Sequence, residues 1–169
     1  MTSVKVKTLV VFYSLDGNTR SIAKTIQQKL DADILELRLK KPINPKSFFK
    51  YFWGGFQVIS RSRPQLLPLD KDPRDYQLIF IGTPVWAGNY VSAFRTFLSS
   101  VEIKRKKIAL FCCCGGQNGK TIDRLKKALP GNEFLGEMTF INPLKKDSKG
   151  SKEKVQLWAQ DMMGKTKSS

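Results

Sequence analysis

Residues 7–26 constrain the fold of this chain more than any other stretch. Residues 9–13, LVVFY, form an apolar run without polar alternation, which is typical of a strand buried on both faces of a parallel sheet. Small polar residues follow, and Ile22, Ala23 and Ile26 then recur with the spacing of a helix that buries one face. Because the free N–H groups and the positive dipole end of such a helix face the preceding turn, residues 14–19 form a predicted anion site.

Length and composition favour one domain. The chain has 169 residues, of which 41% are hydrophobic, which is enough for one sizeable core and too short for two comfortable domains. We predict a single domain over residues 1–164 and a polar tail over residues 165–169. No apolar run approaches the ~20 residues of a membrane span, and no signal-peptide pattern precedes the first strand. We therefore expect a cytoplasmic protein.

The three cysteines are adjacent, at positions 112–114. They cannot form a disulfide framework, and the absence of histidine leaves no zinc site, so a reducing compartment fits. We interpret the triplet as small apolar filling at the end of a buried strand. A reactive thiolate at Cys114, next to a helix N-terminus, is the alternative.

The charge is strongly basic. Thirty Lys and Arg against fourteen Asp and Glu give a formal net charge of +16, which attracts acidic proteins, anionic lipid or nucleic acid over a distance. The basic residues are spread along the chain, so a solubilising surface is an equally good interpretation. No aromatic-interleaved RNA motif is present, and nucleic acid ranks last among the partners.

Strands and helices alternate along the rest of the chain. Predicted strands cover residues 33–39, 77–81, 108–114 and 134–141, and predicted helices cover residues 92–101, 121–129 and 152–163. Charged residues interleave the leucines of the second strand and indicate a sheet edge. This alternation predicts an α/β fold: an open, doubly wound, parallel five-stranded sheet of order 2-1-3-4-5 with helices on both faces.

Residues 41–64 contain six aromatic side chains between two prolines. A helix over residues 47–60, interrupted by Gly54 and Gly55, would place on its apolar side Phe48, Phe49, Phe52, Trp53 and Phe56. An ordinary helix covering the sheet is one interpretation. A lid over a ligand and a basic-aromatic surface for a partner or membrane are the others.

The chemistry of the loops can be inferred from their residues. Ligands of such sheets bind beyond the carboxyl ends of the strands, where residues 14–19, 83–90 and 114–119 meet. Ser14 and Thr19 offer hydroxyls, Gly17 lets the backbone close around an oxyanion, and Arg20 can add charge, which together suit a phosphate monoester. Neither a dinucleotide-binding G-x-G-x-x-G nor a nucleotidase P-loop is present. Trp86 is either core or a flat face for a flat ligand. A phosphate and a planar ring together predict FMN.

The segments SLDGNT, GTPVWAGNY and a glycine-rich loop, after the first, third and fourth strands, resemble the flavodoxin family over essentially the whole chain. The resemblance implies an FMN cofactor and no residue that acts as nucleophile or general acid. It implies that the phosphate is held by Ser14, Asp16, Gly17, Asn18 and Thr19. It implies that the isoalloxazine is bordered by Thr83, Pro84, Val85, Trp86, Ala87, Gly88 and Asn89. It also implies that its pyrimidine edge is approached by Cys114, Gly115 and Gly116.

Two features depart from the family. Flavodoxins are usually acidic, whereas this chain is basic, so its redox partner proteins are expected to be acidic. The third loop lacks the aromatic residue that often covers the second flavin face; Tyr90 or the aromatic segment could fill that place, or the face could be open to a substrate.

Three functions follow, in order of preference. The first is an FMN-binding electron carrier of the flavodoxin kind. The second is an FMN-dependent oxidoreductase of the same fold that acts on NAD(P)H and a flavin or quinone, or oxidises protoporphyrinogen. The third is a basic binding module that kept the fold and uses its charge for nucleic acid or membrane. The oligomeric state stays open.

Overall fold

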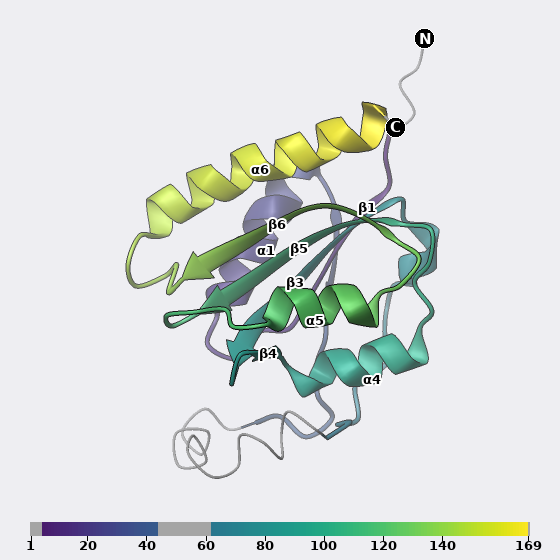
Figure 1. The fold of residues 1–169 in the computed structure, drawn as a ribbon, viewed down its shortest axis with the longest axis vertical. Helices are drawn as coiled ribbons and strands as arrows, with labels where there is room; N and C mark the ends of the chain where they lie inside the picture. Colours follow the sequence, from purple (N-terminus) through teal and green to yellow (C-terminus); the bar gives the residue numbers. More distant parts are fainter. Residues whose placement is uncertain (1–4, 44–61, 169) are drawn as a thin grey trace.

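The computed structural model describes residues 5–43 and 62–168 (Figure 1). Its strands are β1 (Thr8–Phe12), β2 (Asp33–Glu36), β3 (Leu78–Trp86), β4 (Asn89–Tyr90), β5 (Lys107–Cys114) and β6 (Glu133–Ile141). Its helices are α1 (Asn18–Leu30), α4 (Ser92–Ser100), α5 (Thr121–Ala128) and α6 (Ser148–Ser168), with a 3₁₀ turn, η1 (Pro73–Asp75). The predicted alternation of strands and helices is confirmed.

Five parallel strands form the sheet in the order β2-β1-β3-β5-β6, which is the predicted 2-1-3-4-5 order. One more strand, β4, was not predicted; it pairs antiparallel with the end of β3. The chain proceeds from β1 outward to β2 and then returns to β3 on the other side of β1. The strand order therefore reverses between β1 and β3, and a ligand crevice is expected beyond their carboxyl ends.

Two apolar layers cover the sheet. Val10 and Phe12 of β1 pack with residues of α1 and α6, whereas Leu9 and Val11 pack with residues of α4 and α5. In Figure 1 the two helix pairs lie on opposite faces of the sheet. Each such side chain contributes about 1.5–3 kcal/mol on full burial, and burial on both faces explains why β1 shows no polar alternation.

β2 lies at the sheet edge, as predicted, but ends at Glu36 rather than at residue 39. Leu37 N still donates to Phe12 O at 2.8 Å. The chain then leaves the sheet, and Arg38 O accepts from Leu67 N at 2.8 Å in a short antiparallel pairing. The predicted strand is too long because its last residues pair with residues 65–67 instead of β1.

α6 is longer than the predicted helix over residues 152–163, and residues 165–168 are helical instead of forming a tail. Gly164 costs about 1 kcal/mol in a helix interior. Contacts hold this turn of the helix: Lys107 Nζ of β5 donates to Thr166 O at 3.0 Å, and Lys165 pairs with Asp161 at 2.9 Å. These contacts continue the helix past the glycine.

The predicted aromatic helix over residues 47–60 lies outside the described residues. Within the described ranges, none of the helices combines the length and the apolar character that crossing a bilayer requires.

Candidate functional site

Three loops follow the carboxyl ends of the adjacent strands β1, β3 and β5. They therefore lie along one edge of the sheet, on both sides of the point where the strand order reverses. In Figure 1 the β3–β4 hairpin and the loop between β5 and α5 lie at the same end of the sheet. The predicted loops are thus brought to one place.

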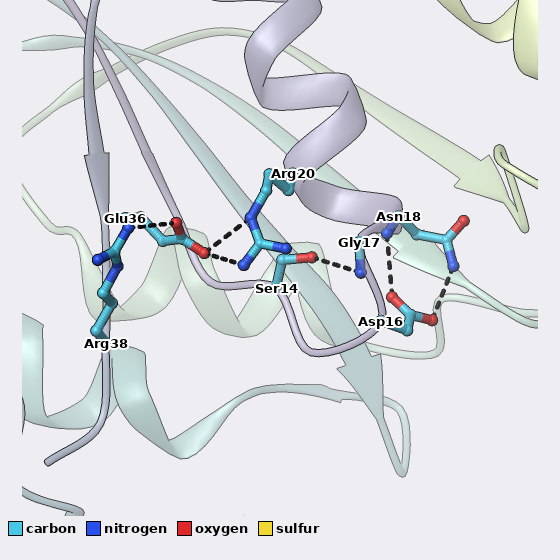
Figure 2. A network of polar contacts seen from close by, with 7 residues as sticks. All are labelled: Ser14, Asp16, Gly17, Asn18, Arg20, Glu36 and Arg38. Carbon is cyan, nitrogen blue, oxygen red and sulfur yellow. Dashed lines mark hydrogen bonds and ion pairs between the residues drawn. The ribbon is translucent and has the colours of Figure 1, made fainter. Parts of the chain in front are cut away.

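The first loop, between β1 and α1, is held by its own side chains (Figure 2). Ser14 Oγ accepts a hydrogen bond from Gly17 N at 3.2 Å, and Asp16 Oδ1 accepts from Asn18 N at 3.1 Å. Gly17 has φ +91°, in the left-handed region that glycine adopts without steric cost. The first hydrogen bond of the helix is donated by Ser21 N to Gly17 O. The backbone N–H groups of Thr19 and Arg20, which precede it, are therefore available at the turn.

Thr19 supplies the most informative polar atom of this loop. Its side chain is fully buried, and its hydroxyl has no nitrogen or oxygen partner among the described residues. The Cys113 thiol beside it is a weak partner, and burial raises the pKa of that thiol well above its usual range. Buried hydroxyls are normally paired. A buried donor at a helix N-terminus, next to the Ser14 hydroxyl and a left-handed glycine, fits a phosphate monoester.

Asn18 connects the first loop to the chain between β6 and α6. Its Nδ2 donates to Asp16 Oδ2 at 2.7 Å, and its Oδ1 accepts from Leu144 N at 3.1 Å. A Cβ atom on Gly17 would lie 3.6 Å from Leu144 Cδ1. Sequence reasoning missed this contact because no pattern links two residues that are 126 positions apart.

Arg20 pairs with Glu36 beside the loop, whereas the sequence suggests that it adds charge to a phosphate. Its Nε donates to Glu36 Oε1 at 3.1 Å, and its Nη2 contacts the same oxygen (Figure 2). Arg38 Nη2 reaches Glu36 Oε2 from the other side at 3.4 Å. Glu36 therefore holds two guanidinium groups beside the loop.

The second loop is shorter than predicted because β3 continues through Trp86. Residues 83–84 pair with β5, and a central strand supported in this way extends beyond the expected end. Trp86 pairs with Asn89, so Ala87 and Gly88 alone close the hairpin, with φ +49° and +68°. Two positive φ values are typical of a type I′ turn, and at Ala87 this conformation carries strain.

Thr83 and Trp86 face inward. The Thr83 hydroxyl donates to Pro84 O at 2.8 Å and accepts from Val91 N at 3.3 Å. Trp86 is 6% exposed and meets Tyr13 edge-to-face, with ring centroids 5.8 Å apart. Burial and, to a smaller extent, the carboxylate of Glu36 raise the pKa of Tyr13 to about 12, so this phenol is neutral. That residues 83–89 border a flavin stays a prediction.

The third loop follows β5. Cys114 is buried and the two glycines after it are exposed. Asn142 Nδ2 donates to Gly115 O at 3.3 Å, and Asn118 Nδ2 donates to Thr139 Oγ1 at 2.9 Å, so β6 supports the loop. Sequence reasoning missed both asparagines. Burial raises the pKa values of all three thiols, that of Cys112 to about 11, which favours the apolar-filling interpretation.

The family model described as flavodoxin matches residues 7–162. The chain belongs to the flavodoxin family. A flavoprotein from Lactobacillus acidophilus NCFM, solved in complex with FMN, is 25% identical, covers 85% of this chain and 99% of its own, and superposes with a TM-score of 0.65.

Two further structures show the same fold. A flavodoxin from Agrobacterium tumefaciens, described as WrbA-like, is 16% identical and covers 96% of this chain and 98% of its own, with a TM-score of 0.65. The two-electron reduced flavodoxin of Megasphaera elsdenii is 18% identical and covers 90% of this chain and 98% of its own, with a TM-score of 0.58.

In this member of the flavodoxin family the second and third loops are joined. Gly88 O accepts from Lys120 N and from Arg124 Nη1, both at 3.2 Å. A Cβ atom on Gly119, which has φ +55°, would lie 2.6 Å from Gly88 Cα. The tip of the hairpin and the start of α5 therefore contact each other directly through their backbones.

Proposed function

We propose that the chain binds FMN at the edge formed by the three loops and carries electrons between redox partner proteins. The observation that carries the proposal is the buried hydroxyl of Thr19 at the start of α1, which has no nitrogen or oxygen partner among the described residues. The family match and the FMN complex of the Lactobacillus acidophilus flavoprotein support it. When bound, FMN would supply the electron-accepting group, and this chain would supply its binding and environment.

The first loop would bind the terminal phosphate of FMN. Thr19 and Ser14 would donate their hydroxyl hydrogens, and the amides of the first turn of α1 would add N–H donors. Asp16 and Asn18 would keep the loop in shape through the bonds that they already make. The ring would be bordered by residues 83–89 of the hairpin and by Cys114, Gly115 and Gly116.

An electron carrier fits the chemistry of the chain. The whole sequence contains no histidine, and a carrier needs no side chain that moves a proton during turnover. Gly115 and Gly116 are exposed, which leaves room for a partner to approach the cofactor edge. Because the formal net charge is +16, we expect that partner to be acidic and its binding to weaken with salt.

A second candidate function is an FMN-dependent NAD(P)H or quinone oxidoreductase. The observation that favours it is the third loop, in which residues 115–119 include no aromatic side chain to cover a flavin face. Two exposed glycines there would leave one face of the ring open to a substrate.

Stepwise dithionite reduction of the FMN-loaded protein, combined with an assay of NAD(P)H oxidation by a quinone, separates the two. The carrier predicts a one-electron stage in the visible spectra and no turnover above that of free FMN. Direct two-electron reduction with protein-dependent turnover would favour the oxidoreductase. A protein that does not bind FMN would contradict both and leave the basic binding module.

A further inference from the structure

A cavity of about 810 Å³ lies beside the edge strand β2. It touches the first loop at Tyr13, Ser14 and Leu15, and residues of the β3–β4 hairpin and of the third loop do not line it. Because the strand order is β2-β1-β3, the cavity and those two loops lie on opposite sides of β1. It shares no lining residue with the proposed ring site, although Tyr13 of the cavity packs edge-to-face on Trp86 of the hairpin. Its volume is in the range of small-molecule sites, about 300–1,000 Å³.

One wall of the cavity is apolar and open to solvent. Leu67 is 43% exposed, and Leu15, Leu39 and Ile43 are half-buried. Backbone hydrogen bonds fix this wall, because residues 38–40 pair with residues 65–67. The wall offers a rigid apolar surface to a ligand.

The facing wall is basic. The Glu36 side chain is 16% exposed and accepts from both Arg20 and Arg38, whose side chains are 40% and 69% exposed (Figure 2). One carboxylate cannot neutralise two guanidinium groups, and Lys24 adds a third cation without a carboxylate partner in the described ranges. Asp70 is the other carboxylate of the lining. Three cations against two carboxylates leave the cavity with a positive charge.

We propose that this cavity is a second binding site, which takes a small amphiphilic anion with an apolar body and one carboxylate, sulfonate or phosphate. Arg38 and Arg20 bind the anionic group through the N–H donors that Glu36 leaves free. The apolar body lies against the wall of Leu67 and Ile43. Glu36 positions both guanidinium groups at the cavity mouth, which reduces the conformational entropy lost on binding.

The test is calorimetric titration of the full chain with 8-anilinonaphthalene-1-sulfonate, which combines an aromatic body with one sulfonate. The proposal predicts saturable binding of one molecule per chain, which FMN does not displace. Arg38→Gln should weaken binding at least fivefold, because it removes the exposed guanidinium. Arg74→Gln is the matched control, since Arg74 is also an exposed arginine paired with a carboxylate, that of Asp72, but lies outside the cavity.

A second variant, Leu67→Glu, places a carboxylate on the exposed apolar wall and should also weaken binding at least fivefold. Absence of saturable binding, displacement by FMN, or equal affinity of the Arg38→Gln and Arg74→Gln variants would each overturn the proposal. The titration of the FMN-free chain with 8-anilinonaphthalene-1-sulfonate does not depend on the proposed function. A chain that binds this probe but not FMN would contradict the proposed function alone.

Discussion

Thr19 is the residue at which stability and the proposed function oppose each other. A buried hydroxyl without a partner costs about 1–3 kcal/mol in mutational data. Thr19→Val keeps the shape and removes the hydroxyl, so it should raise the free energy of unfolding of the FMN-free protein by about 1 kcal/mol. It should also weaken the binding of FMN about tenfold, because one hydrogen bond to a charged phosphate is lost. Urea unfolding and fluorescence titration measure the two effects.

Thr121 is the matched control, because its hydroxyl is also fully buried and without a partner among the described residues, at the start of α5. Thr121→Val should stabilise the protein similarly and leave the affinity for FMN unchanged. Equal FMN affinities for wild type and Thr19→Val would show that the Thr19 hydroxyl does not contact the phosphate.

Residue types predict the chemistry of the first loop but not its surroundings. Ser14, Gly17 and Thr19 indicate an anion site from hydroxyls, a flexible backbone and a helix start, all local properties. The bond between Asn18 and Leu144 joins residues 126 positions apart, and only the tertiary fold brings them together. Arg20 also shows this limit, since it lies on α1 and its partner Glu36 lies at the end of β2.

At the scale of elements, the β3–β4 hairpin and the start of α5 are joined through Gly88 and Gly119. Gly119→Ala would place a Cβ atom 2.6 Å from Gly88 Cα at a positive φ, and neither backbone can yield easily. We expect a loss of at least about 2 kcal/mol in the free energy of unfolding. We also expect weaker FMN binding, because both loops would shift.

Gly116→Ala is the control for this prediction, since a Cβ atom there meets nothing within 4 Å. It should change the stability by less than about 0.5 kcal/mol. Chemical unfolding of both variants measures the difference. Equal stabilities of the two variants would contradict the close contact between Gly88 and Gly119.

Element boundaries were harder to predict than element types. The apolar run of residues 77–81 predicts β3, but its continuation through Pro84 to Trp86 depends on pairing with β5 and β4, which the sequence does not display. α6 continues past Gly164, where Lys107 of β5 donates to Thr166 O and Lys165 pairs with Asp161 one turn earlier. In both cases tertiary or i, i+4 contacts override the local signal that ends an element.

At the scale of the whole molecule, alkaline pH should lower stability. Burial raises the pKa of Tyr13 from 10.0 to about 12. Between those values the folded state keeps a proton that the unfolded state loses, so stability falls as pH rises from about 10 to about 12. Two pKa units correspond to about 2.7 kcal/mol as an upper limit. Tyr13→Phe should flatten the decline in a pH series of urea unfolding curves.

The comparison with Tyr13→Phe is necessary because lysine deprotonation also removes repulsion from a chain of net charge +16. That effect acts equally on both proteins and cancels in the difference. Burial also raises the pKa values of Tyr76 and of the three thiols, and their contributions to the decline are common to both proteins and cancel in the same way. Parallel pH profiles for wild type and variant would show that Tyr13 does not contribute to the decline.

The architecture of the molecule could be predicted almost completely. Alternation of buried strands with one-sided helices determines a doubly wound sheet, and the strand order follows from the family resemblance and the switch-point rule. The cavity beside β2 could not be predicted, because it arises where residues 38–40 leave the sheet to pair with residues 65–67.

The most direct test of the central claim is to titrate the purified protein with FMN and with riboflavin, which lacks the phosphate, and to follow flavin fluorescence. If the first loop holds the phosphate through charge-assisted hydrogen bonds of about 1.5–3 kcal/mol each, FMN should bind at least about 100-fold more tightly than riboflavin. Equal affinities for the two flavins, or no binding of either, would contradict the account.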